Sequence, residues 1–172
     1  MTAKTRSRQL KEPRDVARAR NVHLNILLLA NRSLEQLETI CRAADLTHAQ
    51  YVALFVLCLT PGADVDGLPI GAVADGLLNR ASDTTRLVDR LERAGLAERF
   101  PNPDDRRGVL VRATSKGREV FTDITPRIQE LHRTQWSNLT NDETAQLDRL
   151  LLKALWGDDL GASRFQETPS PK

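Results

Sequence analysis

Hydroxyl and guanidinium side chains gather on one face of the helix expected over residues 81–94 of this 172-residue chain. Leu87 and Leu91 centre its apolar face, and the opposite face carries Ser82, Thr85, Arg86, Asp89 and Arg93. Short polar groups followed by an arginine suit a helix that enters the major groove of DNA, where arginine reaches guanine O6 and N7. An ordinary solvated helix face is the alternative. The candidate DNA-binding residues of this helix are Ser82, Asp83, Thr85, Arg86 and Arg90.

A charged hairpin follows that helix. Residues 97–100 and 109–113 are expected to be short strands, and the turn-forming segment 101–108 joins them. Before the helix, the spacing of Ile70, Val73, Ala74 and Leu77 predicts a short partner helix, with a tight break at residues 78–80. A hairpin directly after a helix-turn-helix is typical of a wing, whose basic tip suits the minor groove. The candidate wing residues are Asp105, Arg106 and Arg107.

The remaining elements are helices, which must position the candidate DNA-binding helix and the hairpin. Apolar residues spaced 3, 4, 3, 4 and 3 apart from Leu27 to Ala44 predict a helix–helix seam, in a helix that we expect to extend back to about Arg14. Capping boxes at Thr47 and Thr140 open a buried helix through Leu59 and a last helix that ends at Gly157. Between them, Thr114 caps a long helix through about residue 136. The fold class is therefore mainly α with a small β-hairpin wing.

The segments 84–96 and 104–114 resemble the MarR family of winged-helix transcriptional regulators, and the similarity extends over about residues 22–156. The family's D-x-R wing element falls on Asp105 and Arg107. The chain departs from the family at Ala113, where leucine is usual. It also has two glycines, Gly71 and Gly76, in the first helix of the pair, and glycine is a poor helix former.

The resemblance implies a homodimer that binds a pseudo-palindromic operator in double-stranded DNA, and a repressor that responds to a small molecule, such as a phenolic or other aromatic effector. It also implies interlocked terminal helices, which agrees with the apolar faces that one small lobe could not cover. The expected plan is a basic extension over 1–20, a dimerisation helix over 21–46, a winged helix-turn-helix domain over 47–114, dimerisation helices over 115–157 and a tail over 158–172. The candidate dimerisation residues are Leu27, Leu34, Leu37, Leu147, Leu150 and Leu151.

Composition excludes several other classes. Two cysteines cannot build a disulfide framework, and no apolar run approaches the roughly 18 residues that span a bilayer, so we expect a cytoplasmic protein. Residues 1–20 carry seven basic and two acidic residues, a net charge of +5, which leaves −3 for the rest. That extension is interpreted either as a solubility tail or as an arm that contacts phosphate.

Catalytic and metal-binding patterns are missing from the sequence. The histidines are far apart, and no cysteine–histidine pair, carboxylate pair or phosphate-binding loop suggests an enzyme or a cofactor. Cys41 and Cys58 are expected to be core thiols, although a redox-responsive regulator that uses either one is an alternative. A helical protein-interaction module without DNA binding is the alternative from a different class.

Overall fold

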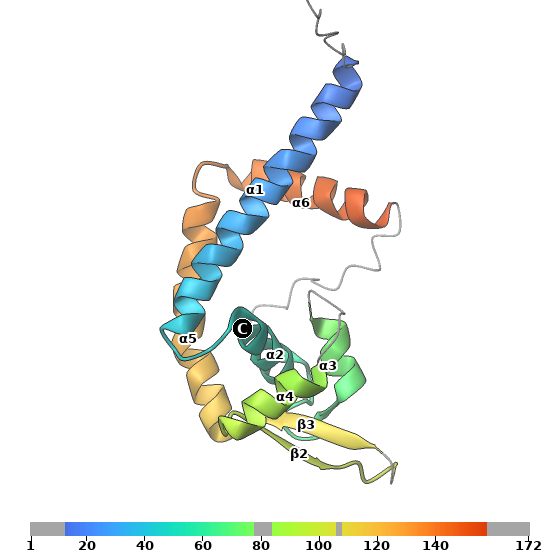
Figure 1. Ribbon diagram of the computed structural model, residues 1–172, viewed down its shortest axis with the longest axis vertical. Coiled ribbons are helices and arrows are strands. Elements are labelled where there is room, and N and C mark those ends of the chain that lie inside the picture. Colours follow the sequence, from blue (N-terminus) through green and yellow to red (C-terminus); the bar gives the residue numbers. More distant parts are fainter. Residues whose placement is uncertain (1–12, 78–83, 106–107, 158–172) are drawn as a thin grey trace, which may run out of the picture. The chain divides into compact units, whose positions relative to one another are not determined.

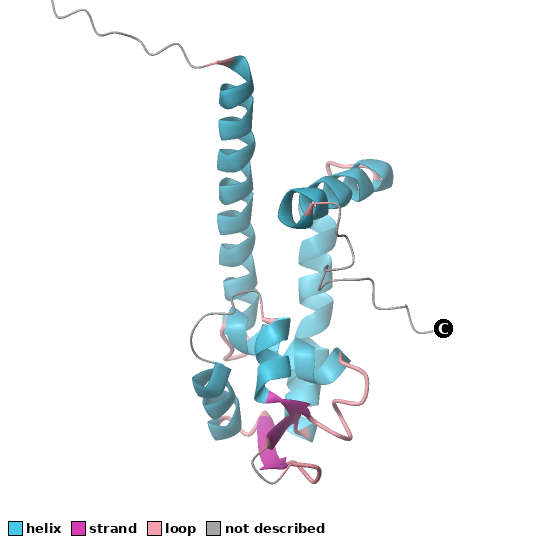
Figure 2. Ribbon diagram, turned by 90° about the vertical axis from the view of Figure 1, so that its right-hand side faces the viewer, coloured by secondary structure: helices cyan, strands magenta, loops and turns pink. Residues whose placement is uncertain are grey.

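The computed structural model describes residues 13–77, 84–105 and 108–157, and it confirms the expected mainly helical fold with a small β-hairpin (Figure 1). Helices make up most of the described chain, and the strands form one small sheet (Figure 2). None of the described helices is both long and apolar enough to cross a membrane. In chain order the elements are α1 (Arg14–Arg42), α2 (His48–Leu59), β1 (Leu68–Pro69), α3 (Ile70–Gly76), α4 (Thr84–Arg93), β2 (Ala97–Pro101), β3 (Val109–Ala113), α5 (Ser115–Gln135) and α6 (Asn141–Trp156).

The chain divides into two compact units, residues 1–36 and residues 37–172. Helix α1 begins at Arg14, as the sequence predicts, and its described part within the first unit has no buried residue. Leu27 and Leu34 are 47% and 43% exposed there. The last turns of α1 belong to the second unit, where Cys41 is fully buried and Leu37 packs against the core.

The core of the second unit forms around α2, which is mostly buried as predicted, although its Phe55 and Leu59 are 38% and 41% exposed. Its Leu54 and Leu57 are fully buried together with Val73, Val88 and Val111 from three other elements. The predicted capping box is present, because the Thr47 N–H donates to Gln50 Oε1 at 2.8 Å and the Gln50 N–H donates to Thr47 Oγ1 at 3.2 Å. Two orphan N–H groups at the start of α2 are thereby satisfied.

The sheet has one strand more than the sequence predicts. Its order is β1-β3-β2, all antiparallel, with Arg99 opposite Val111 in the β2–β3 hairpin and Leu68 opposite Val111 on the other side. Strand β1 has two residues and includes a proline, so it carries no alternating pattern that sequence reasoning could find. Proline is tolerated there because β1 is an edge strand.

The two glycines of α3 lie in different surroundings. Gly76 is the last residue of α3, and a Cβ on it would lie 2.5 Å from Val56 Cγ2 on α2. The missing side chain therefore allows close packing of α3 on α2. Gly71 has open space around it, with no atom within 4 Å of such a Cβ. The predicted break at residues 78–80 lies outside the described residues.

Helices α4 and α5 are joined through a tight junction. Gly95 ends α4 with φ +70°, a conformation that favours glycine. Thr114 caps α5 as predicted: its Oγ1 accepts from the Gly117 N–H at 3.0 Å, while its hydroxyl donates to the Gly95 carbonyl at 2.7 Å. Lys116 Nζ donates to the Ala94 carbonyl at 2.8 Å. The two carbonyls that directly follow α4, those of Ala94 and Gly95, are thus satisfied by the cap and first turn of α5.

Helix α6 starts with its predicted capping box but buries none of its residues in the single chain. The Thr140 N–H donates to Glu143 Oε2 at 2.9 Å, which lowers the pKa of that carboxyl. The apolar face predicted to point inward is open, with Leu150 57% and Leu155 70% exposed. None of the described residues buries this face fully, and its Leu147 and Leu151 are half-buried.

Candidate nucleic-acid interface

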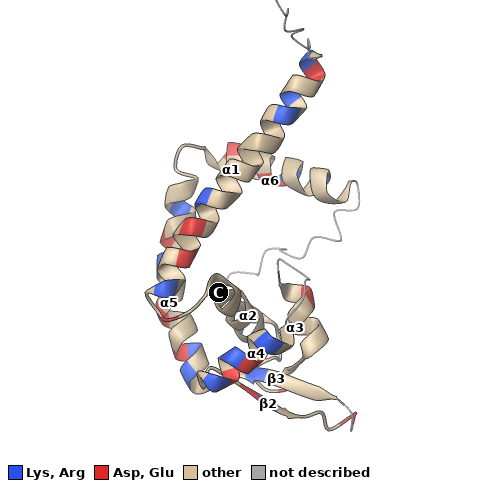
Figure 3. Ribbon diagram, viewed as in Figure 1, with Lys and Arg blue, Asp and Glu red and all other residues tan. Residues whose placement is uncertain are grey.

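Helix α4 separates an apolar face from a polar one. Leu87, Val88 and Leu91 are buried in the core, as predicted, while Thr85, Arg86 and Arg90 are exposed to solvent. Figure 3 shows basic and acidic positions interleaved on this helix. Ser82 and Asp83, the first two candidate residues, lie outside the described residues. The exposed set that remains holds one hydroxyl and two guanidinium groups, which are donors suited to base edges and phosphates.

Asp89 does not belong to the free polar face that the sequence suggested. It is half-buried, and its Oδ1 lies 2.7 Å from Nη1 of Arg99 on β2. The same guanidinium pairs with Glu92 of α4, and its Nη2 donates to the Thr85 carbonyl at 3.1 Å. Sequence reasoning missed Arg99 because a lone arginine in a short strand gives no periodic signal. Two carboxylates three residues apart on α4 were the available hint.

The hairpin predicted over residues 97–113 is confirmed as β2, a turn and β3. The Asn102 N–H donates to the Gly108 carbonyl at 3.0 Å, and the Gly108 N–H donates to the Asp105 carbonyl at 2.8 Å. Asn102 Oδ1 also accepts from the Asp104 N–H at 3.0 Å. These bonds close the turn on an exposed Asp105. Arg106 and Arg107, the basic candidates at the tip, lie outside the described residues.

One guanidinium on the hairpin is already occupied. Arg112 Nε lies 2.7 Å from Glu98 Oε1 on the opposing strand, and its Cζ lies 4.9 Å from the centre of the Phe100 ring. The side chains of this pair are 39% and 48% exposed, so water screens their attraction. The pair stabilises the cross-strand packing of the hairpin, and its net charge is zero.

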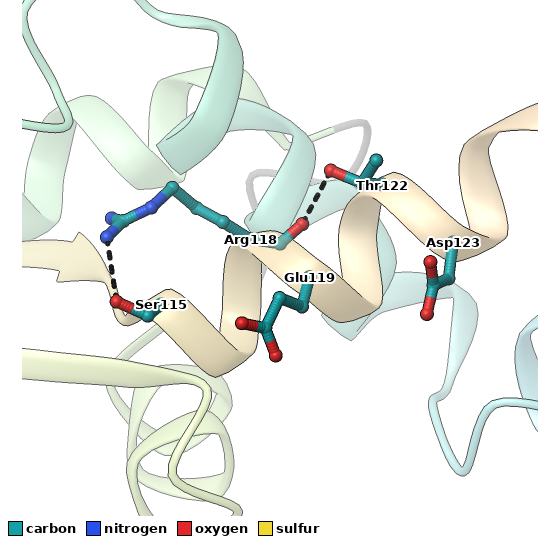
Figure 4. Close-up of a pocket in the computed structure, with 5 residues that line it drawn as sticks. All are labelled: Ser115, Arg118, Glu119, Thr122 and Asp123. Carbon is teal, nitrogen blue, oxygen red and sulfur yellow. Dashed lines mark hydrogen bonds between the residues drawn. The ribbon is translucent and has the colours of Figure 1, made fainter.

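A shallow pocket on α5 offers no second candidate site (Figure 4). Arg118, its only cation, donates to the Ala113 carbonyl at 2.6 Å and to Ser115 Oγ at 3.3 Å, so it holds the start of α5 to β3. Glu119 and Asp123 add negative charge, and Thr122 donates to the Arg118 carbonyl at 2.8 Å. The pocket therefore has neither the charge of an anion site nor a nucleophile next to a base.

Both thiols are in environments that favour the protonated form. Burial raises the pKa of the Cys41 thiol to about 11, and the Glu38 carboxylate acts in the same direction. Burial also raises the pKa of half-buried Cys58, partly offset by Arg118. A redox-sensing thiol needs the opposite shift. In the part of the chain that the structure describes, no three His, Cys, Asp or Glu side chains are grouped to hold a metal ion.

Comparison with known proteins gives results that agree with this geometry. A family model described as MarR family matches residues 44–108. The multiple antibiotic resistance protein MarR of Escherichia coli is 39% identical over 116 residues, which cover 64% of this chain and 74% of that protein. The transcriptional repressor MprA of E. coli is 25% identical over 134 residues, or 78% of this chain and 72% of MprA.

A solved structure also matches. The crystal structure of a mutant MarR from E. coli, complexed with operator DNA, has a TM-score of 0.68 and 30% sequence identity. The similarity covers 78% of this chain and 94% of that one. The winged-helix arrangement of α3, α4, β2 and β3 is therefore an arrangement found in a protein solved on DNA.

Proposed function

Because this chain belongs to the MarR family of transcriptional regulators, we propose that it is a sequence-specific repressor that binds double-stranded DNA as a homodimer. The observation that carries the proposal is the exposed row Thr85, Arg86 and Arg90 on α4, next to a hairpin whose turn carries Asp105. A helix of this kind fits the major groove, and the hairpin fits the minor groove beside it. The related MarR structure with operator DNA supports this docking.

The proposed contacts divide into two groups. On α4 and just before it, Ser82, Asp83, Thr85, Arg86 and Arg90 face the bases and the adjacent phosphates. Arg86 is the residue for base readout because its guanidinium can bond guanine O6 and N7 together. The wing group, Asp105, Arg106 and Arg107, follows the minor groove, where negative potential attracts a cation.

The homodimer is proposed from apolar surface that the described residues leave exposed. Leu27 and Leu34 of α1 and Leu150 of α6 are each more than two-fifths exposed. Leu37, Leu147 and Leu151 are half-buried and extend the two faces. Exposed apolar faces of this extent usually mark a protein contact. The domain plan follows: 21–46 and 115–157 form the dimer, 47–114 binds DNA, and segments 1–20 and 158–172 flank them.

A small aromatic effector is proposed as the signal that releases DNA. Tyr51 and Phe55 of α2 and Phe121 of α5 form one cluster, with ring centroids 5.8 to 6.5 Å apart. Phe55 is 38% exposed, so the cluster offers an accessible ring edge. Aromatic rings favour other rings at such distances. A thermal-shift screen of phenolic acids tests this, since a ligand of the folded form raises its midpoint.

Selection from a pool of duplex fragments tests DNA binding directly. We expect an inverted repeat with half-sites about one helical turn apart, and a log–log salt slope of several units, since each phosphate contact contributes about −0.9. Failure to select any sequence would favour the protein-interaction module. Arg86→Ala should relax base preference in each half-site at a cost of about 1 to 3 kcal/mol, whereas Arg127→Ala, an equal loss of charge on α5, should not.

A further inference from the structure

We infer that Arg99 is a positioning residue that fixes the wing to the recognition helix, so that α4 and the hairpin meet DNA as one rigid unit. The inference rests on the proposed function, because it assigns a role within the same DNA-binding site. Arg99 itself lies at the root of the hairpin, in β2, three residues before the turn at Asn102 begins. It is one of the two arginines in the described part of the hairpin, together with Arg112.

The backbone of Arg99 faces α4 because of the sheet order. Strand β2 is at the edge of the sheet, since the order is β1-β3-β2. An N–H group on the outer side of an edge strand has no strand partner. The Arg99 N–H instead donates to Glu92 Oε1 of α4 at 3.1 Å. A carboxylate of the helix thus takes the place of a neighbouring strand.

The side chain of Arg99 makes three more contacts with the same helix. Nη1 lies 2.7 Å from Asp89 Oδ1 and also pairs with the second oxygen of Glu92, while Nη2 donates to the Thr85 carbonyl at 3.1 Å. Residues 85, 89 and 92 are four and three positions apart, which places them along one side of α4 over two turns. A planar guanidinium with several fixed donors holds a direction, which a single point contact cannot do.

The second arginine of the hairpin provides an internal comparison. Arg112 pairs with Glu98, and both belong to the hairpin, so this pair ties β3 to β2 without reaching α4. Its side chain is 39% exposed, against 22% for Arg99. The Arg99 contacts are therefore the better shielded of the two, and they connect β2 of the hairpin to α4.

The angle between α4 and the hairpin matters because the recognition helix and the wing must enter adjacent grooves together. If the root of the hairpin is released, the wing samples several directions and binding must select the competent one, which lowers the apparent affinity. Arg99 also neutralises two carboxylates beside the DNA-binding face, so its loss alone would add repulsion toward phosphate. A test must separate positioning from charge.

The test compares Arg99→Met with the triple variant Asp89→Asn, Glu92→Gln, Arg99→Met, in which none of the three side chains carries a charge, in the full-length protein on its selected operator. Methylation protection at guanine N7 reports the major groove, and hydroxyl-radical protection reports the minor groove. We expect both variants to keep the N7 protection from α4 and to lose the minor-groove protection from the wing, with affinity reduced on the order of tenfold. Arg112→Met, the control, should keep both footprints.

Three outcomes would overturn the inference. The triple variant could regain the minor-groove footprint, which would reduce Arg99 to charge neutralisation. Arg112→Met could lose that footprint equally, which would make the effect general to the hairpin. Both Arg99 variants could bind with unchanged footprints. That result would leave the proposed function standing and would refute the Arg99 clamp, meaning the contacts of Arg99 with Thr85, Asp89 and Glu92. If Arg99→Met fails to fold, Arg99→Lys replaces it, because lysine keeps the charge without the planar donors. Arg99→Lys should likewise keep the major-groove footprint and lose the minor-groove footprint.

A measurement without DNA separates this inference from the proposed function. Amide hydrogen exchange over residues 97–101 should accelerate several-fold in Arg99→Met, while exchange over 115–135 stays unchanged. Acceleration in a protein that selects no DNA would refute the proposed function and leave the clamp intact. Unchanged exchange over 97–101 would refute the clamp, whatever the DNA result.

Discussion

Replacing Gly117 by alanine should destabilise the fold, because α5 passes very close to the chain that leaves α4. A Cβ on Gly117 would lie 2.0 Å from the Leu96 carbonyl oxygen and 2.9 Å from its carbon. The oxygen would have to recede by about 1.4 Å to reach an ordinary contact distance of 3.4 Å. Both atoms are backbone, so no side-chain rotation can relieve the overlap. The junction between α4 and α5 must open instead.

The size of the effect follows from three contributions. Overpacking a close backbone contact costs about 1 to 3 kcal/mol. Moving Leu96 also breaks its hydrogen bond from the Thr114 N–H, 3.1 Å long, which costs about 1 kcal/mol. The higher helix propensity of alanine returns about 1 kcal/mol. The net loss in the free energy of unfolding is therefore about 1 to 3 kcal/mol.

Gly71→Ala is the matched control for this substitution. A Cβ there has no atom within 4 Å, and its φ is not in the left-handed region, so alanine should stabilise α3 by about 0.5 to 1 kcal/mol. Urea denaturation followed by circular dichroism measures both variants at one protein concentration, since the stability of the proposed dimer depends on that concentration. A Gly117→Ala protein that unfolds at the same or a higher urea concentration than the parent would refute the packing argument.

Three further predictions concern the dimer, the wing and the buried thiol. Leu150→Asp should yield monomers in analytical ultracentrifugation, whereas Arg149→Asp on the same helix should not; a Leu150→Asp dimer would place the interface elsewhere. Arg107→Ala should cost about 1 to 3 kcal/mol of DNA affinity in a gel-shift titration with the melting temperature unchanged, and parental affinity would remove the wing from the DNA contact. Cys41 should resist thiol reagents at pH 8, because its pKa is about 11 against an ordinary 9.0, and rapid labelling of the folded protein would contradict its burial. The protonated thiol contributes fully to the free energy of unfolding below pH 9.0. This contribution is lost as the pH rises towards 11.

Local sequence patterns predicted most of the elements correctly. Capping boxes at Thr47 and Thr140 and the cap at Thr114 act within one turn, so they can be found without knowing the fold. The apolar spacing of α4 likewise predicted the burial of Leu87 and Leu91. The hairpin was predictable because, between its strands, proline fixes φ and glycine permits the conformations that a turn needs.

The amino-acid sequence by itself determined where helices begin, which faces are apolar and which side chains are candidates for DNA contact, since these depend on neighbours a few residues away. Only the tertiary structure decided that Asp89 forms an ion pair with Arg99 and that β1 joins the sheet. It also decided that Gly76 and Gly117 are needed for close packing. Each of these depends on atoms that are distant along the chain and meet only after folding, and no local pattern carries that information.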